Sequence, residues 1–166
     1  MKNGVLKRLG MSGPGDLQRL WAVLSRMPGG RRVMSRLVGE AAPYTGTIRA
    51  EILELRPGYA RLAMRDRRAV RNHLDCVHAI ALMNLAEETS GLATMMALPP
   101  GARGIISGLS IDYAKKARGR LEAECHTEVA APQARTEHQV QVAIRDGKGD
   151  VVATATARWV IEPARS

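Results

Sequence analysis

The stretch AIALMNLAEETSGLATMMAL occupies residues 79–98 and predicts the longest helix of the chain. It contains no proline, and its first glycine is Gly91. Apolar side chains occur on almost every face of this helix, which indicates burial on more than one side. Pro99, Pro100 and Gly101 then end it, because proline and glycine disfavour continued helix. Such a helix needs a second layer of structure to cover it.

Alternating apolar and polar residues, the pattern of strands, flank the helix on both sides. Before it, residues 47–55 and 59–64 surround the turn residues Pro57 and Gly58 and predict a β-hairpin. After it, four more alternating runs follow, at residues 104–117, 120–131, 137–150 and 151–162. The sequence therefore predicts an α+β fold of order ββαββββ, in which one long helix covers one face of an antiparallel sheet.

Two shorter helices are predicted ahead of the first strand. Asp16 is a candidate N-cap for a helix that continues to Met27, and the glycine-rich turn at residues 28–30 ends it. A second short helix covers residues 31–40. We expect residues 1–43 to form an N-terminal helical extension that braces a main domain at residues 44–163.

Length and composition restrict the class of protein. The chain has 166 residues, 45% hydrophobic and 25% charged, which is typical of one soluble globular domain. It has no Phe, two Trp and three Tyr, too few rings for a platform that stacks nucleic-acid bases. Its two cysteines cannot form a dense disulfide framework, and no apolar run has the length of a transmembrane helix. We therefore expect a cytoplasmic location and no transmembrane segment.

The net charge of +9 is concentrated near the start of the chain. Residues 1–40 carry eight basic and two acidic side chains, whereas the remaining 126 residues carry 17 and 14. The excess therefore belongs largely to the N-terminal extension, where it is either solvated surface charge or a contact for a polyanion or anionic lipid. Because the charge does not cover the main domain, we expect no nucleic-acid partner.

Polar and reactive side chains gather between residues 71 and 88. The segment before the long helix contains Asn72, His73, Asp75, Cys76 and His78. Glu87 and Glu88 lie in the middle of the helix, where a carboxylate costs free energy unless it is paired or used. We expect one of these two glutamates to reach solvent and the other to serve a site.

Three chemistries are conceivable for this cluster. A metal site built on His73, Asp75, Cys76 and His78 lacks the ligand spacing of known zinc motifs, so no metal is predicted. A nucleophilic Cys76–His78 pair lacks an evident third group to orient it. The third is acid–base chemistry, in which Glu87 activates water or attacks while free amides at the helix start polarise a carbonyl.

The acid–base hypothesis has a geometric consequence. His78 and Glu87 are nine residues apart, about 13.5 Å along a helix. They cannot meet on one carbonyl within a single chain, so such a site must be shared by two subunits. Two antiparallel helices in a dimer would place the start of one beside the middle of the other.

The spacing of Asn72, His78 and Glu87 resembles the N…HGG…D/E segment of hotdog-fold thioesterases of the phenylacetate-pathway type. The phrases GLSIDYAKKARGRLEAE and DGKGDVVATATARWVIE, at residues 108–124 and 146–162, look like that superfamily's strand after the helix and closing hairpin. The similarity covers about residues 47–161 and is greatest to a branch of unknown function. It implies the hotdog fold, an antiparallel sheet wrapped around one central helix, here with extra N-terminal helices.

The resemblance also implies an activity and roles for single residues. The activity is hydrolysis of an acyl-CoA or related thioester by a homodimer or a tetramer of two dimers, with coenzyme A as part of the substrate and no other cofactor. Glu87 matches the catalytic acid, and Asn72 the side chain that positions water or substrate. The amide of Ala79 matches the oxyanion donor, and His78 the motif histidine, whose role is often structural.

Two departures and five basic residues complete this interpretation. Ala79 and Ile80 replace the Gly-Gly pair, which makes the wall near the thioester bulkier, and Ile106 stands where some relatives have a Ser or Thr that assists the acid. Guanidinium and ammonium groups suit the phosphates of coenzyme A. The candidates for this contact are Arg68, Arg71, Lys115, Lys116 and Arg118, with solvated surface charge as the alternative reading.

Two other functions are compatible with the same residues. His73 precedes Glu87 by fourteen residues, as the catalytic His and Glu do in hotdog dehydratases, although the Pro-Gly that starts their helix is missing. The second is a hotdog protein that binds or senses acyl-CoA without turnover. Formation of enoyl product would indicate the first, and acyl-CoA binding without thiol release the second.

Overall fold

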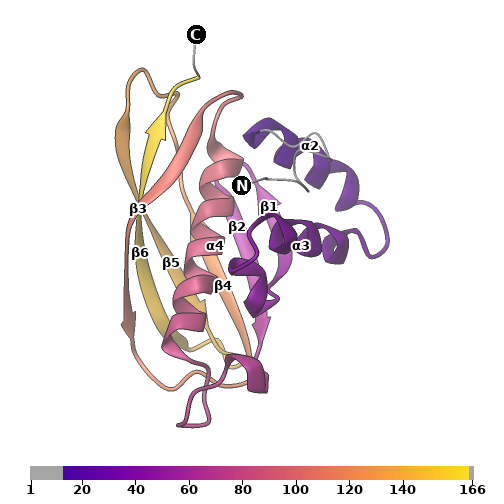
Figure 1. The fold of residues 1–166 in the computed structure, drawn as a ribbon, viewed down its shortest axis with the longest axis vertical. Helices are drawn as coiled ribbons and strands as arrows, with labels where there is room; N and C mark the ends of the chain where they lie inside the picture. The colour runs from indigo at the N-terminus through magenta and orange to yellow at the C-terminus, as the bar shows by residue number, and fades with distance from the viewer. Residues whose placement is uncertain (1–12, 165–166) are drawn as a thin grey trace.

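The computed structural model describes residues 13–164. Six strands form one antiparallel sheet, in the spatial order β1-β2-β4-β5-β6-β3 (Figure 1). The strands are β1 (Glu51–Arg56), β2 (Tyr59–Arg65), β3 (Arg103–Tyr113), β4 (Arg120–His126), β5 (Thr136–Arg145) and β6 (Val151–Glu162). The helices are α2 (Pro14–Leu24), α3 (Gly30–Ala41) and α4 (Ala79–Ala97), with short 3-10 turns η1 (Thr45–Ile48) and η2 (Arg68–Val70).

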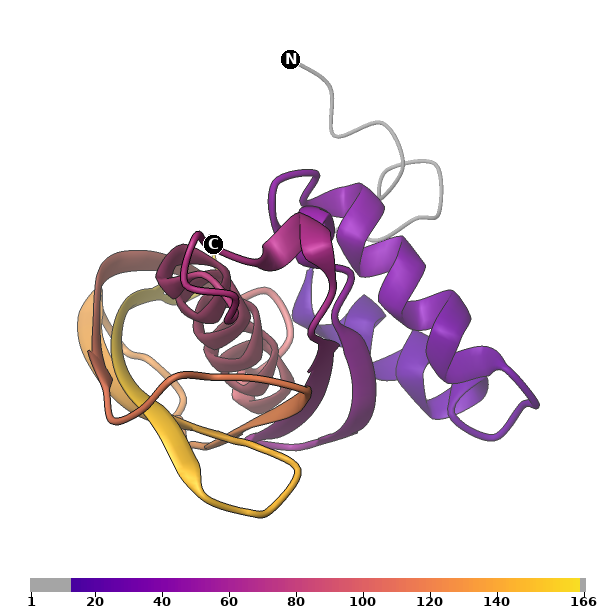
Figure 2. The ribbon, with the colours of Figure 1, turned by 90° about the horizontal axis from the view of Figure 1, so that it is seen from below.

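The sheet curls around α4, as the end-on view in Figure 2 shows. Every second side chain of a strand points to the helix, which is why β4 alternates between buried and partly exposed positions. Gly91 lies where α4 meets β6, since a Cβ there would be 3.1 Å from the ring of Trp159. The predicted order ββαββββ and the central helix are thus confirmed, and this architecture is the hotdog fold.

Helices α2 and α3 lie outside β1 and β2 and extend the same hydrophobic core (Figures 1 and 2). Gln18 of α2 donates hydrogen bonds to the carbonyls of Met96 and Leu98, at 3.1 and 3.3 Å. It thereby satisfies carbonyl groups that the end of α4 leaves without helical partners. Met34 of α3 is fully buried. These two helices therefore stabilise the end of α4 and one side of the sheet.

The two edge strands of the sheet differ. The edge strand β1 packs against α3, and the amide of Ile52 donates to the Ser35 hydroxyl at 2.8 Å. Within residues 13–164 no further strand pairs with the outer edge of β3. Ile105 on β3 is 66% exposed. An uncovered strand edge with an exposed apolar side chain is suited to pairing with another strand.

Several element boundaries differ from the sequence-based expectation; the strands expected at residues 104–117 and 137–150, for example, end at Tyr113 and Arg145. Helix α2 begins at Pro14 after Gly13 and ends at Leu24, so Asp16 lies in its first turn instead of capping it. Proline is well suited to the first helical position because it lacks an amide hydrogen. The first strand begins at Glu51, since residues 45–48 form η1 and Arg49 has a left-handed backbone. The fourth strand ends at His126, before the loop that leads to β5.

Among the described helices, none is both long and apolar enough to cross a membrane.

Candidate functional site

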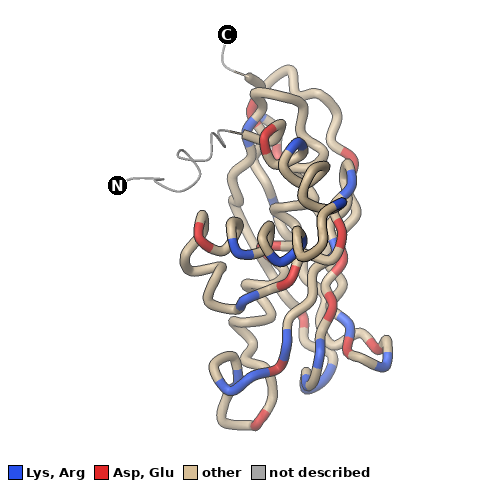
Figure 3. The backbone as a smooth tube through the Cα atoms, turned by 90° about the vertical axis from the view of Figure 1, so that its right-hand side faces the viewer, with Lys and Arg blue, Asp and Glu red and all other residues tan. Residues whose placement is uncertain are grey.

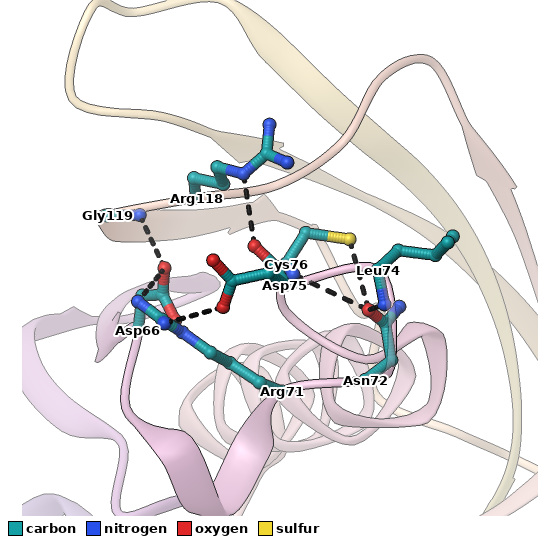
Figure 4. Close-up of polar contacts among 8 residues, drawn as sticks. All are labelled: Asp66, Arg71, Asn72, Leu74, Asp75, Cys76, Arg118 and Gly119. Atoms are coloured by element: carbon teal, nitrogen blue, oxygen red, sulfur yellow. Dashed lines mark hydrogen bonds and ion pairs between the residues drawn. The ribbon is translucent and has the colours of Figure 1, made fainter.

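Asn72 organises the loop that leads into α4. Its Oδ1 accepts hydrogen bonds from the amide of Leu74 at 2.9 Å and from the amide and thiol of Cys76, both at 3.4 Å (Figure 4). An asparagine that accepts from amides further along the chain stabilises a tight turn. The side-chain oxygen of Asn72 is therefore used within the loop. The Nδ2 group of the same side chain is the part that remains to contact a ligand.

An ion-pair cluster anchors the same loop to the β3–β4 connection. Asp66 accepts from Arg71 Nε at 2.6 Å and from the amide of Gly119 at 3.0 Å (Figure 4). The bond from Arg71 is the main cause that lowers the pKa of Asp66. Arg71 also reaches Asp75 at 2.7 Å, while Arg118 Nε donates to the carbonyl of Asp75 at 3.1 Å. Arg71 and Arg118, which were both predicted to bind phosphates, thus stabilise this loop instead.

The remaining predicted phosphate ligands fall into two groups. Lys115 is paired with Asp146 at 2.8 Å and Asp150 at 2.6 Å, across the β5–β6 hairpin. Arg68 and Lys116 are exposed, and no carboxylate of the described chain lies within 4.0 Å of them. Of the five basic residues expected to bind coenzyme A, these two carry free side chains.

His78 is the N-cap of α4. Its Nδ1 accepts a hydrogen bond from the amide of Ile80 at 3.0 Å, which satisfies one of the free donors of the first helical turn. The amide of Ala79 has no hydrogen-bond acceptor in the part of the chain that the structure describes. The hydroxyl of Tyr113 donates a hydrogen bond to the backbone carbonyl of Ala79 at 3.1 Å. The helix start therefore presents a free amide, as the oxyanion hypothesis requires.

Glu87 lies in the middle of α4, half-buried, and the Thr45 hydroxyl of η1 hydrogen-bonds to its carboxylate. Burial raises the pKa of Glu87, and the bond from Thr45 opposes that rise. One turn earlier, Asn84 Nδ2 donates to the carbonyl of Tyr44 at 3.3 Å. The segment at residues 44–48 therefore covers the face of α4 that carries Glu87.

Glu88 is more deeply buried than Glu87. It is 7% exposed, and its Oε2 is buried with no hydrogen-bond partner among residues 13–164. Burial, reinforced by the neighbouring Glu87, raises the pKa of Glu88 to about 8. Of the two glutamates, Glu87 therefore keeps partial access to solvent and Glu88 is buried, while η1 packs against α4 on this side.

The structure groups the predicted catalytic residues at two places. Asn72, His78 and Ala79 lie at the start of α4, and Glu87 lies eight residues beyond Ala79, about 12 Å along the helix axis. The Cys76–His78 pair does not form, since the Cys76 thiol faces Asn72 and His78 Nδ1 faces Ile80. His73 is exposed on the loop. In residues 13–164 no three His, Cys, Asp or Glu side chains converge as metal ligands would.

Sequence reasoning missed two contacts of the candidate site. Thr45, the partner of Glu87, lies in a segment that carried no motif. Tyr113, the partner of the Ala79 carbonyl, lies at the end of β3, 34 residues away in sequence. Only the packing of η1 and β3 on α4 brings them there.

Solved structures with this fold include proteins described as thioesterases. A structural-genomics protein is 32% identical and has a TM-score of 0.76, over 89% of this chain and 98% of that one. A Pseudomonas aeruginosa protein of unknown function, described as a probable thioesterase, is 21% identical with a TM-score of 0.71, over 82% and 96%. A Haemophilus influenzae thioesterase is 13% identical with a TM-score of 0.69, over 80% and 90%.

The two lower identities support the fold alone, and the resemblance to hotdog thioesterase structures is confirmed at that level. No curated protein sequence matches the chain. A family model does match it, over residues 30–161, which is most of its length and begins at the first residue of α3. The chain therefore belongs to the family defined by the domain of unknown function DUF4442.

Proposed function

We propose that this protein hydrolyses an acyl thioester, such as an acyl-CoA, with Glu87 as the catalytic carboxylate. The observation that carries the proposal is the half-buried Glu87 on the central helix, held by Thr45, in a fold that solved thioesterases share. A carboxylate with a raised pKa and one hydrogen-bond donor is suited to take a proton from water at neutral pH.

The start of α4 supplies the second part of the chemistry. Water that loses its proton to Glu87 attacks the thioester carbon, and the carbonyl oxygen becomes an oxyanion. The free amide of Ala79, at the positive end of the helix dipole, would donate to that oxyanion. The carbon–sulfur bond then breaks, and the thiol leaves with the proton from Glu87. The free Nδ2 of Asn72 would position water or substrate, and His78 would hold the helix start in place.

The distance between these two parts supports a site shared by two subunits. Ala79 and Glu87 are too far apart along one helix to act on one carbonyl. Antiparallel pairing of two β3 edges would bring the start of one α4 beside the middle of the other. Exposed apolar side chains on this side of the molecule, Ile80 and Ile105, would be buried by such pairing. The proposed assembly is a homodimer, or a tetramer of two dimers.

The free side chains of Arg68 and Lys116 are the proposed contacts for the phosphates of coenzyme A, which enters as part of the substrate. Arg71, Lys115 and Arg118 would contribute to this contact while they keep their protein partners. Both cysteines are buried and free, which fits the proposed cytoplasmic location.

A panel of acyl-CoA esters with short, long and aromatic acyl groups, read out by release of free thiol, tests the proposal. We expect wild-type turnover on at least one ester. Glu87→Gln should lower it by about 100-fold or more, because the base is lost. Ala79→Pro removes only the helix-start amide, since proline is tolerated at this position, and should lower turnover by about 100-fold.

Gel filtration of both variants checks that the assembly persists. Acyl-CoA binding without thiol release by the wild type would contradict hydrolysis and favour the binding function. Full activity of Glu87→Gln would contradict the assigned role of that residue.

A further inference from the structure

An open pocket of about 940 Å³ lies on the side of the molecule formed by α3, η1 and the ends of β1 and β2. Arg67 and Ala69, from the segment between β2 and α4, also line it, as does Thr45, the partner of Glu87. Figure 3 views this side and shows basic positions along α3 and on the chain beneath it. Five arginines line the pocket: Arg32, Arg36, Arg49, Arg65 and Arg67.

These five guanidinium groups have no ion-pair partner in the described part of the chain. Within residues 13–164 no carboxylate lies within 4.0 Å of any of them, whereas Arg71 and Lys115 elsewhere on the surface are each paired with two aspartates. Glu40 and Glu51 also line the pocket: Glu51 lies 3.8 Å from Arg120, and Glu40 pairs with none of the five arginines, so five positive charges face two carboxylates. The pocket therefore carries unneutralised positive charge.

Two of the arginines repel one another. Burial and the nearby charge of Arg49 both lower the pKa of Arg67. Arg67 is held in place because it donates to the carbonyl of Thr47. Arg49 has a φ of 53°, a left-handed conformation that residues with side chains adopt at a cost. The fold thus keeps two like charges together, and an anion bound between them would relieve their repulsion.

The pocket also contains a polar group with no partner. Glu88 lines it, is 7% exposed, and has a buried Oε2 without a hydrogen bond. With a pKa of about 8, Glu88 carries its proton at neutral pH and adds no negative charge to the pocket. Its carboxyl can therefore donate a hydrogen bond to a ligand oxygen at the base of a basic pocket.

We propose that this pocket binds the diphosphate group of an organic diphosphate. Arg32 and Arg36 are four residues apart on α3 and so lie on one helix face, while Arg49, directly after η1, and Arg67, directly before η2, form a second pair. A guanidinium group donates two parallel hydrogen bonds to a phosphate, so two pairs match two linked phosphates. The volume exceeds that of diphosphate alone and leaves room for the organic part.

The diphosphate could come from coenzyme A, as the carrier of a substrate, in which case Arg68 and Lys116 are left to contact its separate 3′-phosphate, or from a free nucleotide diphosphate that acts as an effector. Both sources present the same group to the arginines. The experiment below separates them, and it does not depend on hydrolysis at Glu87, because it measures binding.

Calorimetric titration of the full chain with pyrophosphate tests the proposal, in parallel with the double variants R32Q/R36Q and R26Q/R31Q. Arg26 and Arg31 are exposed residues of the same helical extension that do not line the pocket, so the second variant removes the same charge elsewhere. We expect saturable binding by the wild type, weakening by about tenfold or more in R32Q/R36Q, and a change below about twofold in R26Q/R31Q.

The second step is competition by coenzyme A and by ADP. Displacement of pyrophosphate by coenzyme A, with a raised KM for acyl-CoA in R32Q/R36Q, would identify the carrier as the source. Displacement by ADP alone would identify a free nucleotide. Absence of pyrophosphate binding, or equal weakening in both double variants, would overturn the proposal. A wild type that binds pyrophosphate but hydrolyses no thioester would overturn only the proposed function.

Discussion

Replacing Glu88 with glutamine should remove a pH-dependent loss of stability from the folded chain. The carboxyl is buried without a partner for Oε2, and its pKa is about 8 in the folded chain against an ordinary value of 4.5. Between these two pH values the unfolded chain ionises this group and the folded chain does not. The free energy of unfolding of the wild type therefore decreases as the pH rises through this window, and it changes no further above it.

The size of the effect follows from the two pKa values. Each pH unit between them costs about 1.4 kcal/mol, so raising the pH from 5 to 8 should cost the wild type on the order of 3 kcal/mol through this residue. Glutamine has nearly the same shape and does not ionise. The Glu88→Gln variant should lack that decrease. The free energy of unfolding of the variant, minus that of the wild type, should therefore be larger at pH 8 than at pH 5.

Urea unfolding at pH 5 and pH 8 measures the effect, with all proteins at one concentration because the assembly state contributes to stability. Glu128→Gln is the matched control, since Glu128 is exposed on the loop before β5. We expect the control to follow the wild type. Equal decreases in wild type, Glu88→Gln and the control would refute the assignment of Glu88 as a buried, proton-carrying group.

Three further predictions concern stability. His78→Ala removes the cap of α4 and should cost about 1 kcal/mol in urea unfolding, with recovery in His78→Asn; no loss would contradict the capping role. Gly58→Ala should cost more than about 1 kcal/mol, because φ is 70° and a Cβ would lie 2.0 Å from the Thr127 carbonyl oxygen; a thermal melt equal to wild type would disprove this. Asp66→Asn should be destabilising at neutral pH, and the difference should shrink as the pH falls through the lowered pKa of Asp66; a pH-independent difference would count against the ion pair with Arg71.

The fold could be predicted from the sequence because its signals are local. The apolar character of residues 79–98 and the alternation of the strands each depend on neighbouring residues, and the structure confirms both. The start of the first strand is the main exception. Alternation from Thr47 favours a strand there, but packing on α3 and α4 makes residues 45–48 a 3-10 turn, and β1 begins at Glu51. There, tertiary contacts decide the conformation against the local pattern.

The candidate site was less predictable, because its partners are distant in sequence. Lys115 appears free in the sequence, yet it pairs with Asp146 and Asp150 of a later hairpin. The pocket arginines are the reverse case, because they are distant in the sequence and lie together in the structure without ion-pair partners among the described residues. Arg36 and Arg67 come from separate elements, and only the packing of α3 beside the sheet places both in one pocket. Charge counts alone do not show which basic side chains remain unpaired.

The central proposal, a hydrolytic site shared by two subunits, is tested most directly with a mixed dimer. One subunit carries Glu87→Gln and the other Ala79→Pro, and two different affinity tags isolate the mixed species. If each site combines the Glu87 of one subunit with the helix start of the other, the mixed dimer has one intact site and one doubly altered site. It should release thiol from acyl-CoA at about half the wild-type rate, although each parent variant is slowed by about 100-fold. A mixed dimer as inactive as its parents would contradict the shared site.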